Sequence, residues 1–340
     1  MRTLLSICIP SYNRPRQLSE LLSSVDCDPQ NVEIVICEDN SPQREQIRKS
    51  IEVFSGQSPY TVNYYENSVN LGYDGNLRRL IELANGQFVM FMGDDDLFVP
   101  GALHRFLDFL FEHRDKKYIL RSYVVVHPDG AVENFKYLKK TTVLPPGEET
   151  VAWLFKRSVS IAGFTISKDE AKAVATDRLD GTLLYQVYLM AEVCLKNESI
   201  FCDIPTAQVV QSFRNGKPMF GSSDREKKRY TPGIISQENS INFAKSYFEI
   251  TDYLDTKNET NLTKCVKKQL SKYSYPFLSI QRKHGISLFL SYAKRLETEL
   301  GFGCTSYFYI YKWALTLLGE KNCDRLILYV KNTFGYTPNL

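Results

Sequence analysis

The stretch from Phe88 to Pro100 reads FVMFMGDDDLFVP, and the rest of the chain is best interpreted from it. Five apolar residues run into Gly93, and three successive carboxylates follow, Asp94, Asp95 and Asp96. A short apolar run that ends at a turn signal is typical of a buried parallel strand. Open α/β sheets bind ligands at the carboxyl ends of such strands. The stretch therefore predicts a ligand site directly after a buried strand.

The three carboxylates also indicate what kind of ligand to expect. Adjacent carboxylates repel one another and lose hydration when they are partly buried, unless a cation or hydrogen-bond donors compensate. Hard oxygen ligands suit Mg²⁺ or Mn²⁺, and such ions commonly accompany a nucleotide diphosphate. The alternative is a solvated acidic turn that caps the helix expected from about Pro100. Because three acidic residues exceed what a cap needs, we favour a metal or nucleotide site.

Length and composition narrow the class of protein. The 340 residues suffice for one large α/β domain with a smaller appendage, and a net charge of +3 is too small to indicate a nucleic-acid partner. The eight cysteines form no CxxC pair, which predicts reduced thiols rather than disulfides or a zinc site. No apolar run approaches the roughly 18 residues of a membrane span. We therefore expect a cytoplasmic protein with at most peripheral contact at the inner face of a membrane.

Strand and helix patterns alternate four times before residue 115. Each expected strand is followed by apolar residues at helical spacing, which predicts a parallel sheet with right-handed crossovers. The loops after the first, second and fourth strands are polar, mostly acidic, and should meet at one edge of the sheet. The expected strands are Leu4–Pro10, Val32–Cys37, Thr61–Tyr65 and Phe88–Met92.

The remaining sequence divides at about residue 230. A helix is expected at Gly181–Lys196, and a strand at Ala207–Phe213 opens into Arg214–Tyr230, which we interpret as a mobile lid. Beyond Pro232 only helical patterns remain, so we expect domains at 1–230 and 231–340. Tyr307–Trp313 is aromatic and partly basic; a core helix is favoured over a helix lying on a membrane surface.

Four ordered motifs, SICIPSYNRP, VICEDNSP, NLGYDGN and FMGDDDLF, resemble those of the inverting family 2 glycosyltransferases with the GT-A fold. Several motifs in order are far more specific than any one of them. NLGYDGN and GDDD are most similar to the bacterial abequosyltransferase-like branch, which adds deoxysugars or hexoses to surface polysaccharides. The resemblance implies an α/β, GT-A type, mostly parallel sheet flanked by helices, with a C-terminal all-helical region.

The resemblance also implies roles for individual residues. Asp39 would bind the base, and Asp95 and Asp96 would hold Mn²⁺ or Mg²⁺ as the DxD motif, with Gly93 where the first aspartate usually stands. Glu38 stands where many relatives have an aspartate. A Gln211–Arg214 segment resembles the QxxRW signature without its Trp. The expected nucleotide-sugar-binding residues are Pro10, Tyr12, Arg14, Asp39, Asn70, Gly72, Asn76, Asp94, Asp95 and Arg214.

An inverting enzyme needs a general base for the acceptor hydroxyl, and the resemblance assigns it to Asp180, with Asp177 as a near neighbour. Asp180 would then face the same cleft as Asp95 and Asp96 and stay partly open to solvent. The alternative is that Asp180 is an ordinary N-cap of the following helix.

The function expected from all of this is metal-dependent, inverting transfer of a sugar from a nucleotide-sugar donor to a polysaccharide or lipid-linked oligosaccharide acceptor. A nucleotidyltransferase is the first alternative, but it would carry a glycine-rich basic loop after the first strand, and SYNRPRQ lacks the glycines. A non-catalytic nucleotide-sugar-binding assembly protein is the second. The acidic residues Asp39 and Asp94–Asp96 argue against it.

Overall fold

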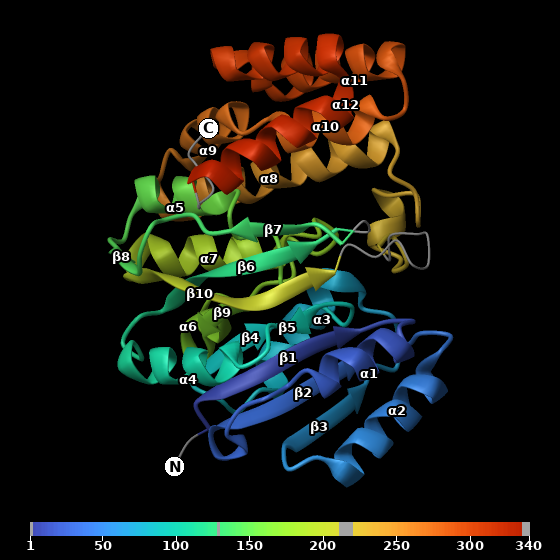
Figure 1. The fold of residues 1–340 in the computed structure, drawn as a ribbon, viewed down its shortest axis with the longest axis vertical. Coiled ribbons are helices and arrows are strands. Elements are labelled where there is room, and N and C mark those ends of the chain that lie inside the picture. Colours follow the sequence, from blue (N-terminus) through green and yellow to red (C-terminus); the bar gives the residue numbers. More distant parts are fainter. Residues whose placement is uncertain (1–2, 128–129, 211–219, 335–340) are drawn as a thin grey trace.

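A single mixed sheet organises the chain in the computed structural model, which describes residues 3–127, 130–210 and 220–334. Its strand order is β3-β2-β1-β4-β9-β6-β10-β5, with β7 paired to β6 and β8 to β10 (Figure 1). The strands are β1 Leu5–Ser11, β2 Val32–Glu38, β3 Thr61–Glu66, β4 Phe88–Phe91, β5 Leu97–Phe98, β6 Tyr118–Val126, β7 Val132–Phe135, β8 Thr142–Leu144, β9 Phe164–Ser167 and β10 Ser199–Val210.

The first half of this sheet is parallel, as the alternating pattern predicts. β1 lies between β2 and β4 and runs parallel to both, and β3 extends the parallel set beyond β2. β2 is buried along its whole length because helices cover both faces, α3 packing directly on β1 and β2. The helices that the structure describes between residues 3 and 210 are α1 Pro15–Ser23, α2 Arg44–Gln57, α3 Gly72–Leu83, α4 Ala102–Glu112, α5 Glu148–Phe155, α6 Lys168–Ala173 and α7 Tyr185–Lys196.

The second half of the sheet is mixed. β9 runs antiparallel to both β4 and β6, whereas β6 and β10 are parallel to each other. The expected GT-A type fold class is confirmed, and the parallel pairing that the sequence predicts belongs mainly to the N-terminal half. The order of strands beyond β4 depends on contacts between distant segments, which local periodicity does not encode.

α7 begins four residues later than expected. Gly181 and Leu183 both have positive φ angles, 91° and 62°, which a right-handed helix excludes. The helix therefore starts at Tyr185, and Asp180 lies in the turn that precedes it. This turn lies beside α3, because the N–H groups of Gly181 and Leu183 donate hydrogen bonds to Asp74 of that helix.

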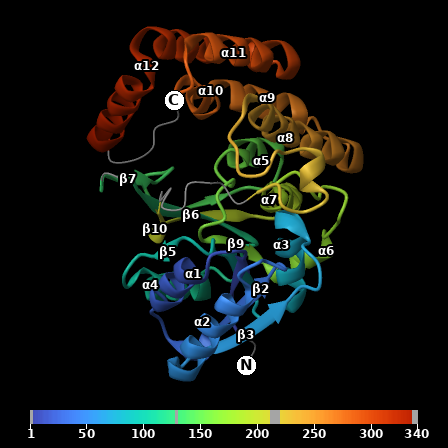
Figure 2. The same cartoon turned by 90° about the vertical axis from the view of Figure 1, so that its right-hand side faces the viewer.

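The C-terminal helices stack at the end of the molecule opposite β3 and α2 (Figures 1 and 2). The all-helical region that the sequence predicts here is confirmed, whereas the division into domains at residue 230 stays a prediction. No helix in the described part of the chain is long and apolar enough to cross a membrane. The helices are α8 Gln237–Asn258, α9 Leu262–Lys272, α10 Tyr275–Arg282, α11 Ile286–Leu300 and α12 Ser306–Phe334, the last bent at Gly319.

All eight cysteines are free thiols, as their spacing predicts. Cys8 and Cys37 are buried inside β1 and β2, and burial raises the pKa of the Cys37 thiol to about 12. These thiols are therefore protonated parts of the core, without a role in binding or in disulfide formation.

Candidate active site

The carboxyl ends of β1, β2 and β4 meet at a cleft of about 300 Å³. It lies where the acidic loops were expected to meet, because parallel strands end at the same edge of the sheet. Phe220, Ser222 and Glu226 line its other side. The cleft is lined by Pro10, Ser11, Tyr12, Arg14, Asp39, Gly72, Tyr73, Asn76, Gly93, Asp94, Asp95, Asp96, Ile161, Phe220, Ser222 and Glu226.

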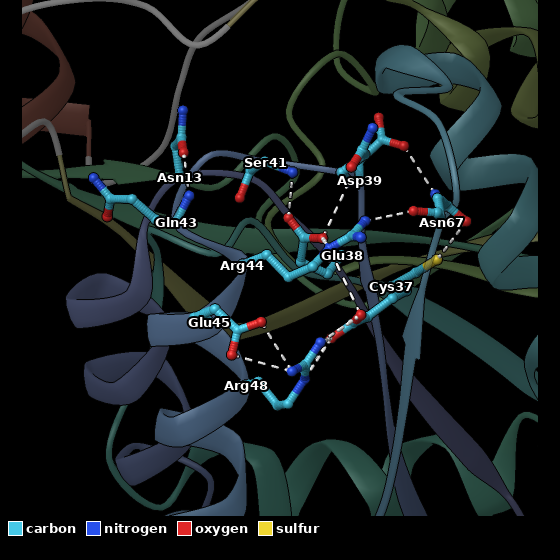
Figure 3. A network of polar contacts seen from close by, with 12 residues as sticks. Asn13, Cys37, Glu38, Asp39, Ser41, Gln43, Arg44, Glu45, Arg48 and Asn67 are labelled. Atoms are coloured by element: carbon cyan, nitrogen blue, oxygen red, sulfur yellow. Dashed lines mark hydrogen bonds and ion pairs between the residues drawn. The ribbon is translucent and has the colours of Figure 1, made fainter.

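Asp39 lies on the wall of the cleft directly after β2. Its carboxylate accepts hydrogen bonds from the backbone N–H groups of Leu71 and Gly72, at 2.8 and 2.9 Å, and from the Asn67 amide at 2.8 Å (Figure 3). Burial raises its pKa to about 6, although these donors oppose the shift. Asp39 therefore joins β2 to the start of α3 and presents an acceptor to the cleft.

Glu38 does not share this role. It is fully buried and points away from Asp39, where its carboxylate pairs with Arg44 at 2.7 Å and accepts hydrogen bonds from Asn40 and Ser41 (Figure 3). Glu38 stabilises the turn after β2. Glu38, which stands where many relatives are expected to have an aspartate, does not line the cleft.

The Asp triplet gathers around one arginine. Arg14 donates to Asp94 at 2.8 Å and lies 3.0 Å from Asp95, and the Tyr12 N–H also donates to Asp94. Burial raises the pKa of Asp94 to about 6, with Arg14 opposing the shift. Burial and the neighbouring Asp95 raise the pKa of Asp96 well above its usual range. Asp95, with a third of its side chain exposed, is the most accessible of the three.

Gly93 lies directly against the Asp96 side chain. A Cβ atom at this position would lie 2.7 Å from an oxygen of Asp96. Because no real side chain tolerates that distance, an aspartate at residue 93 would push Asp96 out of place. The choice of Asp95 and Asp96 as metal ligands in preference to Asp94 stays a prediction.

The triplet does not form a complete metal site by itself. Among the described residues, no three Asp, Glu, His or Cys side chains converge in an arrangement that could hold a metal ion. Mg²⁺ is usually bound by one or two carboxylates together with water and substrate phosphates, so a complete protein cage is not required. The chemistry of Asp95 and Asp96 fits a cation that arrives with a diphosphate.

Asp180 is paired with two arginines. Its carboxylate contacts the Arg78 guanidinium through both oxygens and Arg225 at 2.6 Å, and only 4% of the side chain is exposed. It does not line the cleft. The expectation that Asp180 stays open to solvent is therefore wrong in this structure, because the two arginines cover it. Asp177 is largely exposed and 3.6 Å from Arg225.

The alternative that Asp180 caps α7 is also wrong. The cap is Asp74 of the NLGYDGN motif, which accepts hydrogen bonds from the backbone of Gly181, Leu183 and Tyr185 at 2.8–3.0 Å. Asp74 is buried, and burial raises its pKa to about 7. Sequence distance hides this cap, since 107 residues separate Asp74 from Gly181.

Glu226 is a cleft residue that the sequence analysis did not identify. Its carboxylate accepts hydrogen bonds from the N–H groups of Tyr73 at 2.8 Å and of Gly221, Ser222 and Ser223 at 3.1–3.3 Å. Asp39 and Glu226 thus both cap the start of α3. In the sequence, Glu226 stands inside a charge run, DREKKR, which offers no signal that separates it from solvated neighbours.

The other predicted binding residues fall into three groups. Pro10, Tyr12 and Gly72 line the cleft, and a Cβ at Gly72 would meet Ser223 at 2.4 Å, so this close approach requires glycine. Asn76 also lines the cleft, and its side-chain amide donates a hydrogen bond to the Cys37 carbonyl. Asn70 lies beside it and donates to Ser222 at 3.1 Å. Arg214 and Lys217 lie outside the described residues, as does the first part of the expected lid.

We expect Glu226→Gln to weaken nucleotide-sugar binding about tenfold to a hundredfold. The amide nitrogen cannot accept a hydrogen bond, so one or more of the four donors loses its partner, and each such loss to a charged acceptor is worth about 1.5–3 kcal/mol. Calorimetry with a UDP-sugar measures the change. Asp224→Asn, two residues away and 99% exposed, is the matched control and should bind as the wild type does. Equal affinity of Glu226→Gln and Asp224→Asn for the UDP-sugar would contradict a role of Glu226 in binding.

A mixed sheet flanked by helices, with an acidic cleft at its parallel strand ends and a C-terminal helical region, is a fold of the GT-A type. Comparison with solved structures agrees. The crystal structure of S. aureus TarS 1–349 in complex with UDP-GlcNAc superposes with a TM-score of 0.55 over 95% of this chain and 92% of that chain. At 14% sequence identity, this likeness establishes the fold alone.

The sequence comparisons indicate a family. Residues 6–149 match the model of glycosyl transferase family 2, and this part of the chain is similar to that family. Abequosyltransferase RfbV of Salmonella typhimurium is 36% identical over 101 residues, 29% of this chain and 30% of that protein. The GalNAc(5)-diNAcBac-PP-undecaprenol beta-1,3-glucosyltransferase of Campylobacter jejuni is 31% identical over 101 residues, 29% of this chain and 32% of that protein. These matches span about a third of each relative.

Proposed function

We propose that this protein is a metal-dependent, inverting glycosyltransferase that moves a hexosyl or deoxyhexosyl group from a nucleotide-sugar to a polysaccharide or lipid-linked acceptor. The observation that carries the proposal is the cleft in which Asp39 and the Asp94–Asp96 triplet face one another at the ends of β2 and β4. The similarity of residues 6–149 to glycosyl transferase family 2 supports the same activity. Relatives named as acting on undecaprenol-linked glycans support the acceptor class.

The donor would lie along the cleft with its base at Asp39. An acceptor oxygen beside the backbone at the start of α3 suits the N–H edge of a pyrimidine base, and a neighbour of the same fold is bound to UDP-GlcNAc. Pro10 and Tyr12 border this end of the cleft. The diphosphate would then extend toward Asp95, at the end of β4.

Mn²⁺ or Mg²⁺ bound by Asp95 and Asp96 would stabilise the negative charge that develops on the leaving diphosphate. In the protein alone, Arg14 supplies the positive charge that Asp94 and Asp95 need. Arg14 therefore keeps the triplet in place before the donor arrives. It also remains next to the diphosphate as a hydrogen-bond donor.

Asp180 is our proposed base for the acceptor hydroxyl. Arg78 fixes its carboxylate through two hydrogen bonds, which would orient it as the third group of a catalytic triad orients the base. Arg225, half exposed, occupies one oxygen at 2.6 Å. For an acceptor hydroxyl to reach that oxygen, Arg225 must move away.

The direct test is a thermal-shift screen of UDP-, GDP-, CDP- and dTDP-sugars with and without Mn²⁺, followed by product analysis with the best donor. A glycosyltransferase releases the nucleoside diphosphate and yields a glycosidic product of inverted anomeric configuration. Release of pyrophosphate would instead identify a nucleotidyltransferase. Binding without turnover on any lipid-linked or polysaccharide acceptor would favour a non-catalytic protein.

We expect donor affinity to fall about tenfold between pH 7 and pH 5. Asp39, with a pKa of about 6, accepts a hydrogen bond from the base only when it is ionised, so protonation below pH 6 removes the acceptor. Calorimetry with a UDP-sugar, which has no phosphate group titrating in this range, measures the change. Asp39→Asn should bind the UDP-sugar weakly at every pH, and its affinity should not show the fall between pH 7 and pH 5 that titration of Asp39 causes. An unchanged pH profile in Asp39→Asn would refute the assignment.

A further inference from the structure

The outer face of α12 is strongly apolar. Ile310, Trp313 and Leu317 follow one another at helical spacing, and 58%, 59% and 79% of these residues are exposed. The opposite face is buried, with Phe308 and Leu315 fully inaccessible. The expectation of a core helix at Tyr307–Trp313 is therefore right for one face only.

The exposed residues continue beyond the bend at Gly319. We call the set the α12 apolar stripe, and it consists of Ile310, Trp313, Leu317, Leu318, Leu326 and Tyr329. Every member is more than half exposed. Soluble proteins rarely leave large apolar side chains exposed on successive turns of one helix, as Ile310, Trp313 and Leu317 are, unless they bind something.

The charge of this region indicates what the stripe binds. Residues 231–340 contain 14 Lys and Arg against 9 Asp and Glu, a net charge of +5, whereas residues 1–230 carry −2. Lys321 and Arg325 are exposed on α12 itself, and Lys283 and Lys294 are exposed at α10 and α11. A basic helical end with an apolar, aromatic face complements an anionic lipid surface. Trp and Tyr are the side chains that favour the boundary between lipid and water.

We propose that the α12 apolar stripe docks this protein on an anionic phospholipid surface. The helices lie on the membrane without crossing it, since no helix in the described residues has the length and apolarity to span. α12 belongs to the group of C-terminal helices on the side of the molecule away from β3 and α2 (Figures 1 and 2). The proposal goes beyond the proposed function, because lipid binding requires neither donor nor acceptor.

The test is co-sedimentation of the whole chain with vesicles of phosphatidylcholine and phosphatidylglycerol at 3:1, and with phosphatidylcholine alone. We expect the triple variant Ile310→Ser/Trp313→Ser/Leu317→Ser to bind the anionic vesicles at least about tenfold more weakly than the wild type. Binding should also weaken about tenfold in 0.5 M salt and on uncharged vesicles. The matched control is Val53→Ser/Phe111→Ser, which removes residues 62% and 61% exposed on α2 and α4 and should leave binding unchanged.

Fluorescence gives a second measurement with the stripe intact. The chain has two tryptophans, Trp153 and Trp313. Brominated acyl chains in the anionic vesicles should quench Trp313, so Trp313→Phe should lose the quenching while it still binds the vesicles. Wild-type protein that does not sediment, or a triple variant that sediments equally well, overturns the proposal. The proposal is also overturned if the wild type forms a stable dimer and binds no vesicles while the triple variant is a monomer. That result would assign the stripe to contact with a second copy of the chain.

Discussion

Asp95→Asn should lower sugar transfer by about a thousandfold or more while the melting temperature stays close to that of the wild type. Loss of a metal ligand removes several kcal/mol of stabilisation from the leaving diphosphate, and each 1.36 kcal/mol corresponds to a factor of ten in rate. The fold should tolerate the change, because a third of the Asp95 side chain is exposed and it forms its ion pair with a partly exposed Arg14.

The measurement combines initial rates with Mn²⁺ binding followed by electron paramagnetic resonance in the presence of UDP. Asp95→Asn should bind Mn²⁺ weakly, and EDTA should inactivate the wild type until Mn²⁺ or Mg²⁺ is restored. Asp108→Asn, an exposed carboxylate on α4, is the control and should retain full activity. Full turnover of the wild type in EDTA would refute the metal dependence of the reaction. Full turnover of Asp95→Asn would refute the assignment of Asp95 as a metal ligand.

Asp180→Asn should lower turnover by about a hundredfold or more and also destabilise the protein by about 3 kcal/mol. The rate falls because an amide cannot accept the acceptor's proton. The stability falls because breaking a buried ion pair leaves Arg78 without its charge partner. Rates must therefore be compared at a temperature at which both proteins are fully folded.

A companion variant separates catalysis from stability. Arg78→Met breaks the same ion pair but retains the Asp180 carboxylate. It should therefore be destabilised to a similar extent, whereas its loss of activity should be at least about tenfold smaller than that of Asp180→Asn. Donor affinity should be nearly unchanged in Asp180→Asn, since the residue lies outside the cleft lining. If folded Asp180→Asn turns over at the wild-type rate, Asp180 is only the structural partner of Arg78, and another acidic residue is the base.

Much of the site was predictable because local patterns carry it. The apolar runs of β1, β2 and β4 and the polar residues that follow them place Arg14, Asp39 and Asp94–Asp96 at one edge of the sheet. These residues all line the observed cleft. The roles assigned to them stay predictions, since their position is what the structure establishes. Gly93 shows the same agreement at atomic detail, because its missing side chain makes room for Asp96.

The missed residues act across long sequence separations. Glu226 closes the cleft through the Tyr73 N–H, 153 residues away, and Asp74 caps a helix that begins 111 residues later. Asp180 is covered by Arg78, 102 residues before it. No window of sequence contains both partners of any of these contacts. Hydrophobic periodicity and motif spacing therefore could not predict these three contacts.

The sequence by itself determined the alternation of strands and helices, the acidic edge of the sheet and the similarity of residues 6–149 to glycosyl transferase family 2. Those features depend on hydrophobic period and on short motifs, which act over a few residues. Only the tertiary structure decided that the sheet turns antiparallel after β4, that Glu226 faces the cleft while Glu38 does not, and that one face of α12 remains exposed. The physical reason is that burial and charge pairing depend on which distant segments pack together, and that packing is settled by the whole chain at once.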